Sequence, residues 1–421
     1  MNDYLPRIVD ETIERYLNVF GAVLLVGPKW CGKTTTARQH SKSVVALQDA
    51  SESQNYLRLI DLNPALILEG ETPRLIDEWQ VAPVLWDAVR SEVDRRNEKG
   101  QFILTGSTVP QDLGKRHSGI GRIARLPMQT MSLFESGDST GAISLSALFE
   151  ERIDINGIKS QKTIPDIVEL IVRGGWPDSI GVNEEDASLI VENYVDSLCE
   201  VDIHRVDGVE RNPERVRAIL RSYARNISTL AHRSTIRQDV IAINGPIAES
   251  TFFEYLNALE RLFVIQDLPA WSPSIRSRTV LRGGTKKEFA DPSIAVAAMG
   301  LNSKSMLADV KTLGFLFESM CIRDLRIYAQ ALGGKLSYYA DRTGLESDAV
   351  IHLKDGRYGL IEIKLGGRGI DAGVANLNTL ESLMRENGLQ VPSFKMVLTG
   401  TDLAYKQNDD VMIVPITCLK P

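Results

Sequence analysis

The segment from residue 27 to residue 34 constrains the fold of this chain more than any other. It has the form G-x-x-x-x-G-K-T, follows the apolar run 22–26 and precedes a run compatible with a helix. In such a loop the backbone N–H groups surround a polyphosphate, Lys33 reaches the outer phosphates, and Thr34 can ligate Mg²⁺. An ordinary glycine turn is the alternative, but the flanking strand and helix favour a nucleotide site. The predicted ATP-binding residues are Gly27, Pro28, Lys29, Trp30, Cys31, Gly32, Lys33, Thr34 and Thr35.

A second short strand ends in two adjacent carboxylates. Residues 74–80 read RLIDEWQ, so the apolar part of the strand runs directly into Asp77 and Glu78. This is a Walker B pattern, in which Asp77 holds Mg²⁺ through water and Glu78 orients or deprotonates the attacking water. A solvated strand end is the alternative. The position after a phosphate loop, at the carboxyl end of a strand, favours catalysis.

The next predicted strand, 102–104, is followed by the hydroxyl residues Thr105 and Ser107. In a parallel sheet these side chains lie beside the carboxylates that end the neighbouring strand. We therefore expect Ser107, or Thr105, to sense the γ-phosphate or to position water. Simple turn chemistry is the competing explanation.

Composition narrows the class of protein. Of the 421 residues, 43% are apolar and 24% are charged, which is typical of a globular chain with room for about two to four domains. The formal net charge of −7 argues against a protein whose whole surface coats nucleic acid or an anionic membrane. The four cysteines are far apart and suggest neither a zinc site nor a disulfide framework. No signal core or membrane-length apolar run is present, so we expect a cytoplasmic protein without a membrane partner.

The order of these motifs resembles that of prokaryotic ATP-binding proteins that join an AAA-type ATPase domain to a restriction-endonuclease-like domain of unknown function. The segments GPKWCGKTT, LIDEWQ, FILTGS and HSGIGRIARLPMQTMSLFE carry the resemblance. It implies ATP and Mg²⁺ as cofactors. The family's Gly-Arg step is matched by Gly121-Arg122. The resemblance therefore implies that Arg122, with Arg125 as the alternative, senses phosphate; surface salt bridging is the competing explanation.

The resemblance continues beyond the nucleotide motifs. The segment 174–177, GGWP, is similar to the family's G-G-[FYW]-P turn, and residues 193–203 are similar to its Y-[LV]…[RE]-D-I helix. Both imply packing between the helices of a lid rather than chemistry. The family's usual Arg-Asp step is Val201-Asp202 here, so the basic residue of that step is missing.

A basic stretch and a helical pattern follow. Residues 205–237 contain eight arginines and three acidic residues, a local net charge of +5 that could contact phosphates. Parts of the stretch 228–256 resemble the helices and turn of a winged helix, with Ser250 as the cap of the recognition helix. The partner of this winged helix could be DNA or a protein, because glutamates 249, 254 and 260 make the helix acidic and winged helices also serve as protein contacts. Its predicted apolar face consists of Phe252, Leu256, Leu259 and Leu262.

The end of the chain carries a pattern typical of a nuclease hairpin. Asp348 lies fourteen residues before Glu362, and Glu362 and Lys364 share one face of a strand because they are two residues apart. Asp348, Glu362 and also Glu318 could hold Mg²⁺, while Lys364 could position a water for phosphodiester attack. A solvated ion pair, in a domain that serves as a scaffold, is the alternative.

These observations predict an α/β, multidomain chain. We expect a P-loop AAA-type ATPase domain with a parallel sheet (1–145), a helical lid (146–210), a winged helix (211–300) and a restriction-endonuclease-like domain (301–421). In the first functional hypothesis the chain hydrolyses ATP with Mg²⁺ and drives its last two domains, which act on DNA. In the alternative, ATP gates a regulatory or scaffold protein whose last domain is catalytically silent and binds a protein partner. The sequence leaves a homo-oligomer open in both cases.

Overall fold

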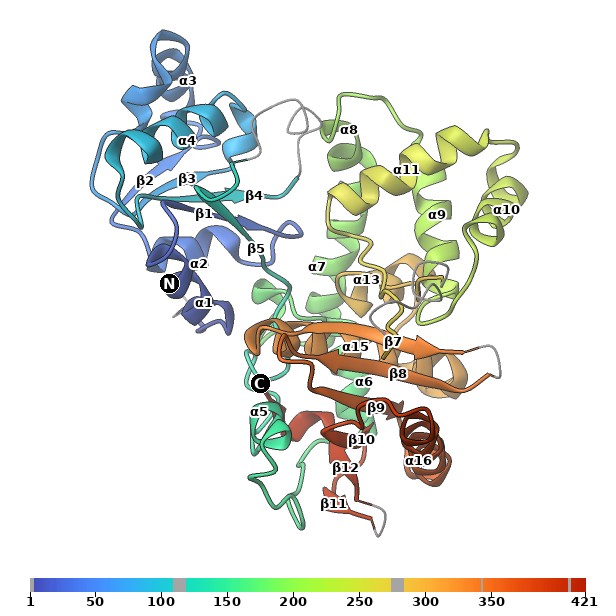
Figure 1. Cartoon of the computed structure of the whole chain (residues 1–421). Helices are drawn as coiled ribbons and strands as arrows, with labels where there is room; N and C mark the ends of the chain where they lie inside the picture. Colours follow the sequence, from blue (N-terminus) through green and yellow to red (C-terminus); the bar gives the residue numbers. More distant parts are fainter. Residues whose placement is uncertain (1–3, 109–118, 274–283, 342–343, 408–409) are drawn as a thin grey trace. The chain divides into compact units, whose positions relative to one another are not determined.

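The computed structural model of this chain describes residues 4–108, 119–273, 284–341, 344–407 and 410–421 (Figure 1). Its internal contacts divide the chain into two compact units. The first unit consists of Met1–Thr130, Glu200–Arg211 and Glu254–Val264. The second consists of Met131–Cys199, Asn212–Phe253 and Ile265–Pro421. Two short segments from later in the chain therefore join the N-terminal residues in the first unit.

The first unit is built on a parallel sheet with the strand order β2-β3-β4-β1-β5. The strands are β1 (Ala22–Val26), β2 (Ser43–Ala46), β3 (Arg74–Asp77), β4 (Phe102–Gly106) and β5 (Ile123–Pro127). All five residues of β1 are apolar and buried, as is typical of a strand covered on both faces. The predicted parallel sheet is confirmed, and β4 lies between β1 and β3.

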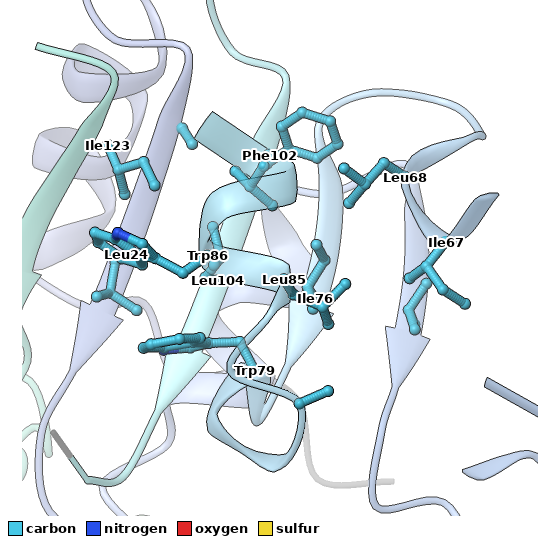
Figure 2. Packing of buried hydrophobic residues seen from close by; sticks show 14 of the residues in the cluster. Leu24, Ile67, Leu68, Ile76, Trp79, Leu85, Trp86, Phe102, Leu104 and Ile123 are labelled. Atoms are coloured by element: carbon cyan, nitrogen blue, oxygen red, sulfur yellow. The ribbon is translucent and has the colours of Figure 1, made fainter. Parts of the chain in front are cut away.

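Helices cover both faces of this sheet. They are α1 (Val9–Leu17), α2 (Lys33–Gln39), α3 (Ser53–Leu62) and α4 (Leu85–Arg96), with short 3₁₀ turns at Pro64–Leu68 and Trp79–Val81. Leu24 of β1 belongs to a buried cluster with Trp79 and Trp86 (Figure 2). Its neighbour Leu25 belongs to a second cluster with Ile13 of α1. Because successive residues of a strand point to opposite faces, β1 is held from both sides, and so is the loop that follows it.

The second unit contains a mixed sheet with the order β11-β12-β10-β9-β8-β7. Its strands are β7 (Lys335–Ala340), β8 (Glu346–His352), β9 (Tyr358–Lys364), β10 (Phe394–Thr399), β11 (Tyr405–Lys406) and β12 (Val411–Pro415). The pairs β7–β8, β8–β9 and β11–β12 are antiparallel, whereas β10 is parallel to β9 and β12. The long helices α15 (Val310–Ala331) and α16 (Ile370–Glu386) pack against this sheet. A separate parallel pair joins β6 (Ile143–Ser144) to β13 (Leu419–Lys420).

The rest of the chain is mainly helical. The helices are α5 (Leu145–Phe149), α6 (Ile164–Arg173), α7 (Glu184–Ser197), α8 (Ile203–Arg205), α9 (Pro213–Arg225), α10 (Arg233–Asn244), α11 (Glu249–Arg261), α13 (Pro292–Met299) and α14 (Ser303–Ala308). A π-helical turn, Leu198–Asp202, continues α7, and 3₁₀ turns lie at Pro177–Ser179, Gly367–Gly369 and Ile416–Cys418. No helix in the described part of the chain is long and apolar enough to cross a membrane.

Some local expectations for the helical region need correction. The helix α11 begins at Glu249, so Ser250 lies inside its first turn rather than capping it. The four residues of its predicted apolar face are buried, as expected. The predicted last domain starts at residue 301, and the stretch 301–307 at its beginning includes most of α14. The sequence SPSIRSRTVLRGGT of residues 272–285 predicts a hairpin with its turn at Gly283-Gly284. Most of this segment lies outside the described residues, but Leu268 and Lys286 on either side form an antiparallel bridge.

Candidate functional site

The loop after β1 has a backbone that only certain residues allow. A Cβ on Gly27 would lie 2.1 Å from the carbonyl oxygen of Met128, so this position accepts only glycine. Gly32 has a φ of 96°, in the left-handed region that favours glycine. The guanidinium of the buried Arg7 donates to the carbonyl oxygens of Cys31 and Gln129, both at 2.8 Å. Arg7 therefore holds the phosphate loop to the segment that follows β5. No local motif in the sequence marks Arg7 for this role.

Lys33 and Thr34 begin α2 at the end of this loop. The Lys33 side chain is buried, and its Nζ donates to the carbonyl oxygens of Gly27 at 3.1 Å and Pro28 at 2.7 Å. Thr34 Oγ1 donates to Asp77 Oδ1 at 2.7 Å. The remaining predicted loop residues differ in exposure: Trp30 and Thr35 are exposed, whereas Cys31 is buried. Of the two residues that a nucleotide site requires most, Lys33 thus contacts the backbone of the loop and Thr34 contacts the end of β3.

Hydroxyl groups from β4 hold the two carboxylates at the end of β3. Thr105 Oγ1 donates to Asp77 Oδ1 at 2.5 Å and accepts from the Glu78 backbone N–H at 3.0 Å. Ser107 Oγ donates to Glu78 Oε2 at 3.2 Å. Glu78 has a φ of 56°, which is uncommon for a residue with a Cβ and turns its side chain out of the strand. The two hydroxyls that the sequence left as alternatives thus have different partners: Thr105 contacts both residues, and Ser107 contacts the Glu78 carboxylate.

Gln80, two residues after Glu78, also belongs to this site, although no motif in the sequence marks it for a role. Its Nε2 donates to Glu78 Oε2 and, at 3.4 Å, to Ser107 Oγ. Its Oε1 makes no hydrogen bond to the described residues, nor does the indole N–H of the buried Trp79. The amide therefore orients the Glu78 carboxylate and keeps one acceptor unused.

The donor set at Asp77 suits a magnesium ion. The Asp77 carboxylate and the Thr34 hydroxyl are oxygen ligands in direct contact, and Mg²⁺ in nucleotide sites takes one or two protein oxygens and completes its shell with phosphate and water. In the described ranges no group of three or more histidine, cysteine, aspartate or glutamate side chains could hold a metal. The residues therefore fit a magnesium ion that arrives with a nucleotide rather than a metal bound by the protein alone.

Lys29, a variable position of the loop, has a partner from later in the chain. Its Nζ forms an ion pair of 2.5 Å with Asp202 Oδ1, which ends the π-helical turn after α7. The Asp202 side chain is buried, whereas 38% of the Lys29 side chain is exposed. Asp202, which follows Val201 at the position where the family usually has a basic residue, thus forms an ion pair with the phosphate loop.

Arg122 lies at the wrong end of the sheet for the role that the resemblance implied. Strands β1 and β5 are parallel with Ala22 opposite Ile123, so Arg122 precedes β5 at the amino edge, roughly 16 Å from the edge where the loop begins. Its Nε donates to Asp94 at 2.8 Å on the surface. Arg125 is exposed in the middle of β5. The structure therefore brings neither arginine to the phosphate loop of the same chain.

The nuclease-like residues converge in the second unit, together with a lysine that the sequence analysis missed. Lys364 Nζ lies 2.6 Å from Glu362 Oε2 and 3.2 Å from Asp348 Oδ2. Lys286 Nζ lies 2.7 Å from Glu318 Oε1 and 3.2 Å from Asp348 Oδ1. All five side chains are buried or partly buried. The cluster thus contains two ammonium groups and three carboxyl groups.

The electrostatics of this cluster do not fit a magnesium site. Burial and the charge of Asp348 raise the pKa of Glu318 to about 8 and that of Glu362 to about 7, so both resist ionisation. Burial alone would lower the pKa of Lys286, but Asp348 and Glu318 raise it above its ordinary value, so this lysine stays charged. The ammonium groups already contact all three carboxyl groups. These residues therefore do not offer the free anionic oxygens that Mg²⁺ requires.

The candidate DNA-contacting groups are mostly engaged within the chain. In the described part of the basic stretch, Arg211 pairs with Asp207, Arg217 with Asp196, and Arg225 lies 3.8 Å from Asp239. On α11, Glu249 and Glu254 are exposed on the side away from the buried apolar face. An exposed acidic face repels phosphates, so α11 does not fit the recognition helix of a DNA-binding domain.

Three sequence families match consecutive parts of the chain. Residues 20–136 match a family described as an AAA domain. Residues 164–305 match a domain of unknown function (DUF8612), and residues 313–419 match another (DUF4143). The family descriptions thus give a function class only for the part that contains the phosphate loop and the carboxylates of β3.

Two curated proteins and one solved structure are similar to this chain. The uncharacterized proteins Mb2031c of Mycobacterium bovis and Rv2008c of Mycobacterium tuberculosis are each 26% identical to this chain over 356 residues, which cover 84% of this chain and 72% of the relative. The Walker-type ATPase PABY2304 of Pyrococcus abyssi has a TM-score of 0.42 and 14% identity, over 70% of this chain and 96% of that chain. From the family match, residues 20–136 are similar to an AAA-type ATP-binding domain.

Proposed function

We propose that this chain is an ATPase that binds ATP with Mg²⁺ at residues 27–34 and hydrolyses it with Glu78 as the catalytic base. The observation that carries the proposal is the arrangement at the carboxyl edge of the first sheet. Thr34 of the phosphate loop contacts Asp77, and Glu78 next to it is held by a hydroxyl and an amide. Phosphoryl transfer requires little more of a protein than positioned phosphates, charge stabilisation and an oriented water.

The loop residues bind the nucleotide. Lys33 donates to two backbone carbonyl groups and, at 4.0 Å, to the Cys31 sulfur, so its ammonium can exchange these partners for phosphate oxygens, which accept stronger charge-assisted hydrogen bonds. Thr34 and Asp77 would hold Mg²⁺, which neutralises charge on the phosphates when bound. The loop therefore supplies binding and the end of β3 supplies catalysis.

Glu78 acts on the attacking water. Its carboxylate accepts hydrogen bonds from Ser107 and Gln80, which restrict its orientation. A positioned general base typically contributes about 10²- to 10⁴-fold to a rate. The nuclease-like cluster of the second unit has no part in this proposal, because lysines occupy its carboxylates.

The test compares Glu78→Gln with the parent chain. We expect ATP turnover to fall at least about 100-fold while the Kd for ATP, measured by calorimetry, stays within about threefold. Glu386→Gln, the same change at an exposed glutamate at the end of α16, is the matched control and retains full turnover. Equal turnover by the Glu78→Gln protein and the parent would remove the assignment of Glu78. Absence of ATP binding by the parent would overturn the proposed function itself.

A further inference from the structure

Protein donors already use nearly every oxygen of the nuclease-like cluster. Asp348 Oδ1 contacts Lys286, and Oδ2 accepts from Lys364 and, at 2.9 Å, from the backbone N–H of Ile363. Glu362 accepts from Lys364 through Oε2 and from Asn376 through Oε1, each at 2.6 Å. A metal ion would have to displace these donors, two of which carry a full positive charge.

Lys286 reaches this cluster from outside the last sheet. It belongs to the strand-like segment that bridges Leu268, and only 5% of its side chain is exposed. Its Nζ contacts one oxygen of Glu318 and one of Asp348, so the ammonium group lies between two carboxyl groups that were predicted to bind Mg²⁺. An ammonium group in that position supplies the positive charge that a divalent cation supplies in a metal-dependent site.

Buried hydrogen bonds hold the residues that follow Lys286 in the chain. Glu288 accepts hydrogen bonds from Ser228 at 3.0 Å and Ser319 at 2.7 Å. Asp291 accepts from the backbone N–H of Gly175 at 2.9 Å. Both carboxyl groups are fully buried, so the segment 286–291 is fixed at several points within the second unit.

We propose that the Lys286 ammonium is the resident cation of this cluster, in the place of a divalent metal ion, and that the second unit therefore binds no divalent metal there and cleaves no phosphodiester. The cluster instead joins the segment 286–291 to α15 and β8. This inference is independent of ATP hydrolysis in the first unit.

Manganese binding tests the proposal. Every protein carries Asp77→Asn, which removes the metal ligand of the nucleotide site, and no nucleotide is added. Free Mn²⁺ is measured by electron paramagnetic resonance during titration of the full chain. We expect Lys286→Ala to gain one Mn²⁺ site, at least tenfold tighter than any binding by the Asp77→Asn chain, and Asp348→Asn to abolish the gained site. Failure of folded Lys286→Ala to gain a site would overturn the proposal.

A second comparison keeps the test decisive if Lys286→Ala does not fold. In the Asp77→Asn chain with Lys286 intact, Asp348→Asn should leave Mn²⁺ binding unchanged. Loss of a bound Mn²⁺ on that substitution would show that the cluster holds a metal in the presence of Lys286. The proposal would then be wrong.

An independent observation in the first unit concerns the attacking water. Two buried polar groups that make no hydrogen bond to the described residues, Gln80 Oε1 and Trp79 Nε1, both lie close to the Cα of Gly106. A Cβ on Gly106 would lie 2.9 Å from the first and 3.0 Å from the second. The first is an acceptor and the second a donor, and buried groups of this kind normally have a partner.

We infer that Gln80 and Trp79 hold the attacking water beside Glu78. This inference rests on the proposed function. The Gln80 amide joins Glu78 to the surroundings of Gly106, because its Nε2 donates to the carboxylate while its Oε1 lies beside Gly106. A water there accepts from the indole N–H and donates to the amide oxygen. Gln80 and Trp79 are then positioning residues, and glycine at 106 is required because a Cβ would intrude between them.

Turnover and binding separate this inference from the proposed function. We expect Gln80→Ala to lower kcat at least tenfold and Trp79→Phe at least threefold, with the Kd for ATP within about twofold of the parent. Trp86→Phe, at the neighbouring tryptophan whose ring centre is 5.3 Å from that of Trp79, is the control and keeps the parent kcat. If the parent hydrolyses ATP and both variants keep its kcat, the water site is wrong and the ATPase assignment stands.

Discussion

Both units of this chain bring carboxylates to strands of a sheet, but different groups hold these carboxylates. In the first unit, Asp77 and Glu78 accept hydrogen bonds from hydroxyl groups and an amide. In the second, Asp348 and Glu362 accept from ammonium groups. Neutral donors leave the negative charge available to an incoming cation, whereas lysines neutralise it. The charge of the partners, rather than the carboxylate pattern, therefore separates a site that can take a metal ion from one that is filled.

The two key lysines differ in the same way. Lys33 contacts two backbone carbonyl groups, which carry no net charge, so a polyphosphate can compete for its ammonium. Lys286 contacts two carboxyl groups in a buried cluster, where its removal would leave Asp348 with one cation fewer. We therefore expect Lys33 to matter for ligand binding and Lys286 to matter for folding.

The largest expected effect follows from removing Lys286. Breaking a buried ion pair by deleting one partner typically costs about 3–5 kcal/mol, because the other charge stays buried. We expect Lys286→Ala to lower the free energy of unfolding by about that amount, measured by urea denaturation followed by circular dichroism. As a control, Lys406→Ala removes an exposed ion pair with Asp410 and should change stability by less than about 1 kcal/mol. Equal effects of the two substitutions would contradict the distinction drawn between the sites.

Lys33→Ala should have the opposite profile. Its ammonium makes no contact with a carboxylate among the hydrogen bonds of the described residues, so we expect a loss of stability below about 2 kcal/mol in the absence of nucleotide. The affinity for ATP should fall at least about 100-fold, because two charge-assisted hydrogen bonds to phosphate contribute about 3 kcal/mol or more. Calorimetry with ATP and urea denaturation without it give both numbers. ATP binding by Lys33→Ala with the parent affinity would contradict the role of Lys33 in nucleotide binding.

Local patterns in the sequence were enough to find the elements of the first site. The loop, the strand that ends at Asp77 and the strand that ends near Ser107 are each encoded within ten residues. Their meeting follows from parallel pairing, since β4 lies between β1 and β3. The sequence could not choose between Thr105 and Ser107, because both follow the same strand and only side-chain geometry separates their partners.

Contacts between distant residues account for what the sequence did not reveal. Lys286 precedes Asp348 by 62 residues, and no spacing rule connects them. Arg7 supports the loop from a segment without a motif. Arg122 was assigned by resemblance, and only the register of β5 against β1 shows that it lies at the amino edge of the sheet. The placement of Arg122 depends on the register of two strands, which a pattern of apolar residues does not fix. The contacts of Lys286 and Arg7 depend on how segments far apart in the chain pack together.

A smaller effect is expected from Glu288, whose buried carboxyl group should make the free energy of unfolding depend on pH. Burial raises the pKa of Glu288 to about 7, although hydrogen bonds from Ser319 and Ser228 and the charges of Arg326 and Lys286 oppose this shift. The unfolded chain releases the proton near the ordinary value of 4.5, so between about pH 4.5 and 7 the folded chain binds more protons and its stability falls as pH rises. Glu288→Gln should reduce this fall by roughly 2 kcal/mol in urea denaturation at pH 5 and pH 7.5. Glu254→Gln, at an exposed glutamate, is the control. Parallel pH profiles for Glu288→Gln and the parent would contradict the prediction.

The smallest expected effect concerns Lys29, the one loop lysine for which the described residues show a carboxylate partner. Its pair with Asp202 is short but more than a third of the Lys29 side chain is exposed, so solvent screens it and a polyphosphate can compete for the ammonium. Because the paired state must be broken before Lys29 can face a phosphate, Asp202→Asn should tighten ATP binding about two- to fivefold. Asp202→Glu should restore the parent Kd, and Asp94→Asn, which removes the surface partner of Arg122, should leave it unchanged. An unchanged Kd in Asp202→Asn would mean that Lys29 does not exchange partners. The first unit would then contain a lysine–carboxylate pair as inert toward its ligand as the one proposed for Lys286.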